Sequence, residues 1–223
     1  AGGYDQDLLR EGARDLVYVS SPEEHRRIVW QFCAGCGPAD ARSFKATVEA
    51  LQGEGEDNGL VEQMWLDATR TPHLTQDEQV RLVRVLRVWS AQQHSRRRNK
   101  GAAIGKSGYY VQGMHMLVSC PLWAGLEEAE ALQIFEFVVK NLAANYYGDE
   151  DFSAFQRDTI VLEELVKERL PQLAEAMKAA GLPTQLLAFD PLLCLFTLHA
   201  PRQVALRLWD MLLIEGETAI FAL

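Results

Sequence analysis

The 223-residue chain is long enough for one substantial domain or two small ones, and its 48% hydrophobic composition can supply a core. Its 22 Lys and Arg stand against 31 Asp and Glu, a net charge of -9. That charge argues against nucleic acid as the main partner, because such binding depends on neutralising phosphates. No apolar run approaches the roughly 20 residues that cross a bilayer, so we expect no direct membrane insertion and a cytoplasmic location.

Helical periodicity runs along the chain without sustained polar and apolar alternation, which predicts an all-α fold. Ser21 and Pro22 form a typical helix start, and Thr75 and Glu78 have capping-box spacing. Pro171 interrupts one long pattern and predicts a helix pair. In chain order, the predicted helices cover residues 22–35, 41–51, 61–66, 75–94, 110–120, 126–142, 149–177, 192–198 and 201–213.

The chain opens on Ala1 without an initiator Met and stops inside the apolar pattern of residues 220–223. Neither an internal repeat nor a linker between domains divides it. We therefore expect residues 1–223 to form a single helical domain that belongs to a longer protein and is cut short at its C-terminal end.

The basic segment from Arg96 to Gly108 is predicted to be a mobile loop. Within it, the sequence of residues 101–107 is close to the motif of the phosphate-binding loop of NTPases. Only three residues separate Gly101 from Gly105, whereas that loop needs four, and no strand pattern precedes it. Intrinsic NTPase activity is therefore not expected.

Metal and redox chemistry have little support in the sequence. Cys33 and Cys36 have C-x-x-C spacing, but no second Cys or His pair follows at zinc-ligand spacing. The five histidines are dispersed, and no nucleophile-elbow pattern supports a catalytic serine. The four cysteines are too few for a disulfide framework, which favours a reducing compartment.

Two polar residues allow both a structural and a functional interpretation. Arg70 ends a helical piece and would be near Asp67, one turn earlier, so a local ion pair alone would explain it. Gln112 precedes an apolar helix and would be explained as a polar group that satisfies free N–H donors at a helix start. Neither residue by itself predicts a function.

The motifs around these residues resemble the TBC domain of Rab GTPase-activating proteins. They are Met64-x-x-Asp67-x-x-Arg70-Thr71, then Tyr110-Val111-Gln112-Gly113-Met114, with Arg26-x-x-Val29-Trp30 before them and Arg207-Leu-Trp209-Asp210 after them. The resemblance runs through almost the whole chain and implies an all-α, two-lobed, V-shaped domain. Met64 replaces the usual Ile, Tyr109 a common Gly, His115 a frequent Asn and Pro191 a typical Trp.

The resemblance implies a GTPase-activating protein that acts on a Rab-family small GTPase in its GTP-bound form. Arg70 would be the arginine finger and Gln112 the glutamine finger. Asp67 would orient Arg70 through a charge-assisted bond, Tyr110 would pack, and Gly113 would let the backbone approach closely. The domain would not be an enzyme by itself. The alternative is a catalytically inactive TBC scaffold that binds a GTPase or another partner.

The expected partners follow from this resemblance. The domain would have no cofactor of its own, because the GTPase carries GTP and Mg²⁺. Recruitment to endomembranes would depend on the partner or on regions outside this chain. A basic segment close to Gln112 is either a solvated loop or a surface that attracts an acidic GTPase. Its candidate partner-binding residues are Arg96, Arg97, Arg98, Lys100 and Lys106.

Overall fold

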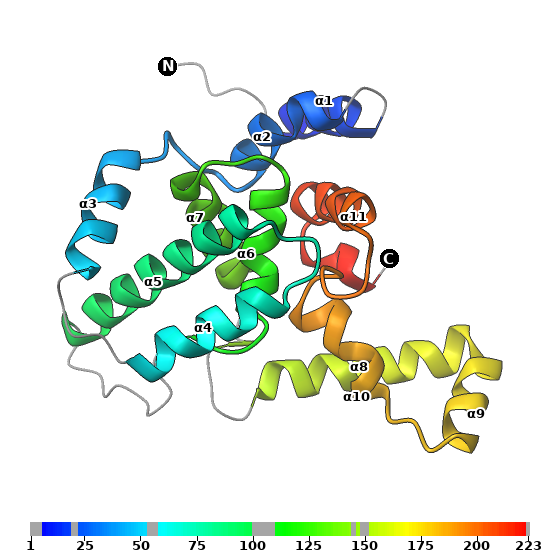
Figure 1. Cartoon of the computed structure of the whole chain (residues 1–223). Helices are drawn as coiled ribbons and strands as arrows, with labels where there is room; N and C mark the ends of the chain where they lie inside the picture. The colour runs from blue at the N-terminus through cyan, green and yellow to red at the C-terminus, as the bar shows by residue number, and fades with distance from the viewer. Residues whose placement is uncertain are drawn as a thin grey trace.

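The computed structural model describes residues 6–18, 22–52, 58–99, 110–143, 146–147 and 152–221, and within them the chain is helical without a β-strand. The all-α prediction is confirmed. Figure 1 shows α1 (Gln6–Tyr18), α2 (Pro22–Cys33), α3 (Ala41–Leu51), α4 (Asn58–Arg70), α5 (Gln76–Asn99), α6 (Met114–Trp123), α7 (Glu128–Phe137), α8 (Ser153–Arg169), α9 (Pro171–Ala179), α10 (Thr184–Ala188) and α11 (Arg202–Glu215). Two π-helical turns follow α7 and α10, at η1 (Val138–Leu142) and η2 (Phe189–Leu193), and the 3-10 turn η3 (Glu217–Phe221) follows α11.

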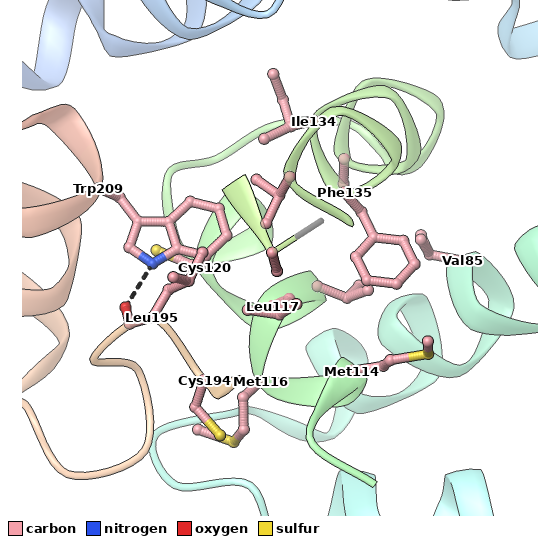
Figure 2. Close-up of a cluster of buried hydrophobic side chains, with 14 of the residues drawn as sticks. Val85, Met114, Met116, Leu117, Cys120, Ile134, Phe135, Cys194, Leu195 and Trp209 are labelled. Carbon is pink, nitrogen blue, oxygen red and sulfur yellow. Dashed lines mark hydrogen bonds between the residues drawn. The ribbon is translucent and has the colours of Figure 1, made fainter. Parts of the chain in front are cut away.

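Helix α6 is the centre of the core. It packs against α4, α5, α7 and α11, and all ten of its residues are buried. A helix that is apolar on every side is stable only when other elements surround it. Figure 2 shows Leu117 of α6 between Phe135 of α7 and Trp209 of α11, and the Trp209 indole N–H donates to the Leu195 carbonyl oxygen at 2.9 Å.

A buried ion pair joins α2 to α11. The Arg26 guanidinium donates two hydrogen bonds to the Asp210 carboxylate, at 2.8 and 2.9 Å, and the Trp30 indole N–H donates to the same carboxylate at 2.8 Å. The rings of Trp30 and Trp209 lie 5.8 Å apart. Loss of Asp210 would leave the buried charge of Arg26 unpaired, at a cost of roughly 3–5 kcal/mol. These motif residues therefore have a structural role.

Helices α8, α9 and α10 lie to one side of the remaining helices (Figure 1). The predicted break at Pro171 is confirmed: Leu170 leaves the helical conformation (φ -132°, ψ 56°), and Pro171 begins α9. Proline suits the first turn of a helix because its missing N–H has no partner there. Helix α10 then packs against α8, so the chain returns towards the core.

The prediction of a helix over residues 192–198 is wrong. Only Leu192 and Leu193 are helical, as the end of η2; from Cys194 on the chain turns, and Leu195 (φ 45°) and Phe196 (φ 64°) adopt left-handed conformations. The Asp190 carboxylate accepts the backbone N–H groups of Leu198 and His199, at 2.9 and 3.3 Å. The Asp190 side chain thus stabilises a turn that the sequence pattern does not reveal.

Several helix boundaries also differ from the predicted ones. Helix α5 continues to Asn99 instead of ending near His94, so Arg96 lies on a helix rather than in a loop. Helix α6 begins at Met114 because Gly113 (φ 106°) cannot continue a helix, and it runs past Pro121. Helix α4 is longer than residues 61–66, and α1 was not predicted.

Among the described residues, no helix combines the length and the apolar character that a membrane span requires.

Candidate functional site

Arg70 is the last residue of α4, and its side chain is exposed. The helix ends there because the Thr71 hydroxyl donates to the Asp67 carbonyl oxygen at 2.8 Å, while the Thr71 N–H bonds to the Ala68 carbonyl at 3.3 Å. The next turn contains His73 in a left-handed conformation (φ 63°). A cation at this position interacts favourably with the carbonyl groups at the end of the helix. The backbone that carries Arg70 is therefore fixed by local bonds.

A buried hydrogen bond connects the two signature segments. The Tyr110 hydroxyl donates to the Asp67 carboxylate at 2.7 Å, although 43 residues separate them. Asp67 is 2% exposed and Tyr110 is 4% exposed. Burial, followed by the bond to Asp67, raises the pKa of Tyr110 above its ordinary value of 10, so the hydroxyl remains a donor. Arg70 lies three residues after one partner and Gln112 two residues after the other.

The expected direct bond from Asp67 to Arg70 is not formed in this structure. The second oxygen of Asp67 accepts the Gln63 amide N–H at 3.0 Å, one helical turn earlier on α4. Within the part of the chain that is described, no hydrogen bond or ion pair joins Asp67 to Arg70. Asp67 instead holds Tyr110, while the Arg70 side chain extends into solvent.

Gln112 lies in a tight turn between Tyr110 and the start of α6, and its side chain is exposed. The turn is closed by a bond from the Met114 N–H to the Val111 carbonyl at 3.1 Å. Gly113 has φ 106°, a conformation that favours glycine. A Cβ at this position would lie 3.2 Å from the Tyr147 hydroxyl oxygen, so the close approach at Gly113 is made by Tyr147.

Two further side chains support this turn. The His115 ring nitrogen Nδ1 lies 3.3 Å from the Gly113 N–H and 3.1 Å from the Tyr110 hydroxyl. Burial lowers the pKa of His115, against the opposing charge of Asp67. The Tyr147 hydroxyl donates to the Leu193 carbonyl, which ties the turn to η2, and burial raises the pKa of Tyr147.

The predicted basic surface is only partly described. Arg96, on the last turns of α5, lies 3.1 Å from the Glu136 carboxylate, and about half of its side chain is exposed (48%). The side chains of Arg97 and Arg98, and all of Lys100, Lys106 and residues 101–109, lie outside the described residues. The phosphate-loop-like segment falls in that stretch. A role for these cations in partner binding stays a prediction.

Metal-ligating residues do not cluster in the described ranges: they contain no group of three or more His, Cys, Asp or Glu residues that could hold a metal ion. Cys33, at the end of α2, and Cys36, after that end, do not take part in a disulfide. Burial raises the pKa of the Cys36 thiol.

The model of the Rab-GTPase-TBC domain family matches residues 23–223, which include both signature segments. This chain belongs to that family. It is 27% identical over 213 residues to the Growth hormone-regulated TBC protein 1 of Xenopus tropicalis, a match that covers 90% of this chain and 57% of that protein. It is 26% identical over 216 residues to human TBC1 domain family member 2A, covering 93% of this chain and 22% of the relative. The chain thus spans little more than half the length of the first of these relatives.

Solved TBC domains have the same fold. The flagellar RabGAP TBC domain of Chlamydomonas superposes with a TM-score of 0.71 at 23% identity, covering 99% of this chain and 70% of that one. The Ypt/Rab-GAP domain of Gyp1p superposes with a TM-score of 0.75 at 18% identity, covering 97% and 76%. At these identities the likeness supports the TBC fold of this chain, not a particular activity.

The sequence did not reveal three residues that shape this TBC site. Gln63 could have been found, because it lies four residues before Asp67 on one helix face. His115 was considered only as one of five dispersed histidines and as a departure from the family pattern. Tyr147 carries no local signal, since its contact with Gly113 depends on the path of the chain after α7.

Proposed function

We propose that this TBC domain stimulates GTP hydrolysis by a Rab-family small GTPase in its GTP-bound form. Arg70 would act as the arginine finger and Gln112 as the glutamine finger, both supplied in trans. The GTPase would bring the nucleotide and its Mg²⁺, so the domain needs no cofactor of its own. Asp67, Tyr110 and Gly113 would position the two segments without touching the nucleotide.

The chemistry of phosphoryl transfer explains why these two residue types are suitable. Charge spreads over the γ-phosphoryl oxygens in the transition state, and an arginine offers a planar, permanently charged set of donors for it. A glutamine amide both donates and accepts hydrogen bonds, so it can orient the attacking water. Positioning and charge stabilisation account for most of the catalysis, because the reaction asks little covalent chemistry of the protein.

One observation supports the proposal. The 2.7 Å bond from the buried Tyr110 to the buried Asp67 joins two segments that are distant in the sequence, and the residues proposed as fingers, Arg70 and Gln112, are exposed, one on each segment. An exposed Arg70 without an ion pair among the described residues is available to an external anion. The rival interpretation is an inactive scaffold, which would have no chemical need for this pair of residues.

The proposal is tested by single-turnover phosphate release from a panel of GTP-loaded Rab proteins, with and without the domain. We expect at least one Rab to be stimulated by several orders of magnitude and Arg70→Ala to remove that stimulation. Arg42→Ala, which changes an exposed arginine on α3, is the matched control and should leave the rate unchanged. Binding of Rab proteins without any stimulation would establish the scaffold instead.

A further inference from the structure

The His115 ring is placed so that its protonation state affects the turn before α6. His115 is the second residue of that helix and is 8% exposed. Its Nδ1 lies 3.3 Å from the backbone nitrogen of Gly113. A backbone N–H can only donate, so Nδ1 is the acceptor and the hydrogen of the neutral ring is on Nε2. The donating N–H belongs to the peptide unit that joins Gln112 to Gly113.

We propose that His115 is a positioning residue whose neutral ring holds the Gln112–Gly113 peptide, and that protonation of the ring releases this peptide and weakens GTPase stimulation at acid pH. This inference rests on the proposed function of Gln112. It concerns a histidine that does not itself touch the nucleotide.

The geometry gives the protonated ring an alternative partner. Once Nδ1 carries a hydrogen, it can no longer accept the Gly113 N–H, and the two donors face each other. The Tyr110 hydroxyl oxygen, 3.1 Å from Nδ1, can accept the new hydrogen while its own hydrogen stays directed at Asp67. Protonation therefore exchanges a bond that holds Gly113 for one that holds only Tyr110. Because a peptide unit is planar, its rotation changes ψ of Gln112 and φ of Gly113 together and so alters the backbone that carries the Gln112 side chain.

The titratable groups around the ring determine the sign of the effect. Asp67 on α4 favours the protonated ring, whereas burial, the larger influence, opposes it and lowers the pKa below the ordinary 6.5. Among the described residues that contact this turn, the other titratable groups are Tyr110 and Tyr147, which remain neutral because burial raises the pKa of each. Because the pKa of His115 is lowered in the folded state, the ring is neutral and accepts the Gly113 N–H above pH 6.5. This bond is lost as the pH falls through the lowered pKa.

Two substitutions separate positioning from titration. His115→Asn places an amide oxygen near the position of Nδ1, so it keeps an acceptor for Gly113 but cannot titrate in this range. His115→Leu removes the acceptor. We expect His115→Asn to retain the saturated single-turnover rate at pH 7.5 within about threefold, and His115→Leu to lower that rate about tenfold or more, with little change in the concentration that half-saturates it. Circular dichroism and melting show whether each variant is folded.

The pH profile is the decisive readout. The measurement uses the Rab that responds most strongly. At each pH between 5.5 and 8, its rate of GTP hydrolysis with the domain is divided by its intrinsic rate without the domain. We expect this ratio to fall at acid pH for the parent and for His25→Asn, a control on α2, and to stay flat for His115→Asn. A ratio that falls equally in His115→Asn, or does not fall in the parent, would overturn the inference.

A spectroscopic measurement tests the inference independently of activity. Nitrogen NMR of the labelled imidazole should show Nδ1 unprotonated at pH 7.5, and the Gly113 amide shift should follow the titration of this ring. A ring protonated at Nδ1 in its neutral state would overturn the inference. If no Rab is stimulated at any pH, the proposed function fails, while this measurement still decides whether His115 holds the Gly113 amide.

Discussion

The segments that carry Arg70 and Gln112 are held in place by different means. Arg70 ends a helix of 13 residues, and its backbone is fixed by bonds from Thr71 to residues three and four positions earlier. Gln112 lies in a turn whose conformation depends on Asp67 from α4, His115 from α6 and Tyr147 from the segment before α8. Arg70 is positioned by its own helix and Gln112 by tertiary contacts.

This difference predicts which substitutions act on which finger. Changes in the buried cluster under the turn should act mainly through Gln112, because the conformation of Arg70 depends little on it. Changes in Arg70 itself should remove the larger electrostatic contribution to catalysis. Substitutions at Arg70, at Gln112, at the buried bond and at the basic surface can break or sharpen the comparison.

The largest effect is expected for Arg70→Ala. An arginine finger contributes about 10³–10⁵ in rate, or roughly 4–7 kcal/mol. Arg70→Lys should fail almost as badly, because an ammonium cannot reproduce the planar set of donors. Single-turnover hydrolysis at saturating domain, together with helicity and melting temperature, checks this. A folded Arg70→Ala variant with near parental turnover would remove Arg70 from the mechanism.

The next largest effect is expected for Gln112→Ala. Loss of water positioning should lower the saturated rate on an unmodified Rab by about 10², given the size of positioning effects. Because Gln112 is exposed, the stability of the domain should not change. Gln172→Ala, an exposed glutamine on α9, is the matched control. A turnover equal in both variants would leave Gln112 as a structural residue at a helix start.

Tyr110→Phe tests the buried bond itself. The change leaves one oxygen of Asp67 buried without its donor, which should cost about 1–3 kcal/mol of stability. It should also lower turnover about tenfold, because the Gln112 turn loses its anchor. Thermal unfolding and single-turnover hydrolysis give the two values.

The chain offers a close control for that variant. Tyr146, the chain neighbour of Tyr147, donates to the Asp158 carboxylate of α8 at 2.7 Å, the same type of bond at the same length, with neither partner on α4 or in the turn before α6. Tyr146→Phe should cost a similar amount of stability but leave stimulation intact. Equal losses of activity in the two variants would mean that destabilisation, not the position of Gln112, lowers the rate.

The smallest effect is expected at the basic surface. Replacement of Arg96, Arg97 and Arg98 by Ser should slow association with the GTPase a few-fold at low salt and flatten its salt dependence, with the saturated rate unchanged. The pairing of Arg96 with Glu136 limits its share of the effect. Stopped-flow association at two ionic strengths measures this, and a variant that matches the parent at low salt would favour the solvated interpretation.

The sequence predicted the elements whose signals are local. The capping box of Thr75 and Glu78 is formed, with the Thr75 N–H donating to the Glu78 carboxylate at 2.8 Å, and the helix pair breaks at Pro171. The prediction failed at residues 192–198, where an apolar pattern resembles a helix. There the left-handed residue Phe196 donates its N–H to the Asp190 carbonyl, and the carbonyl of left-handed Leu195 accepts the indole N–H of Trp209, which comes from α11.

The same limit applies to the candidate site. The motifs singled out Asp67 and Arg70, and their spacing of three on a helix suggested that they bind each other. The structure gives Asp67 a partner 43 residues away, because the carboxylate faces the buried Tyr110 rather than solvent. Long-range pairs of this kind carry no periodic signal. The contacts of His115 and Tyr147 with the Gln112 turn carry no periodic signal either, because they depend on how α6 and η2 pack.

The central claim is that this domain supplies its own glutamine to the reaction. A small GTPase already has a glutamine that positions water, and a second one is needed only if it takes over that task. The most direct measurement is single-turnover hydrolysis for the four combinations of parent or Gln112→Ala domain with a Rab whose own glutamine is intact or changed to Leu. Two residues that do one job give non-additive losses. We predict that the Rab variant remains substantially stimulated by the parent domain and loses stimulation with Gln112→Ala, whereas full dependence on the Rab glutamine with indifference to Gln112 would contradict the account.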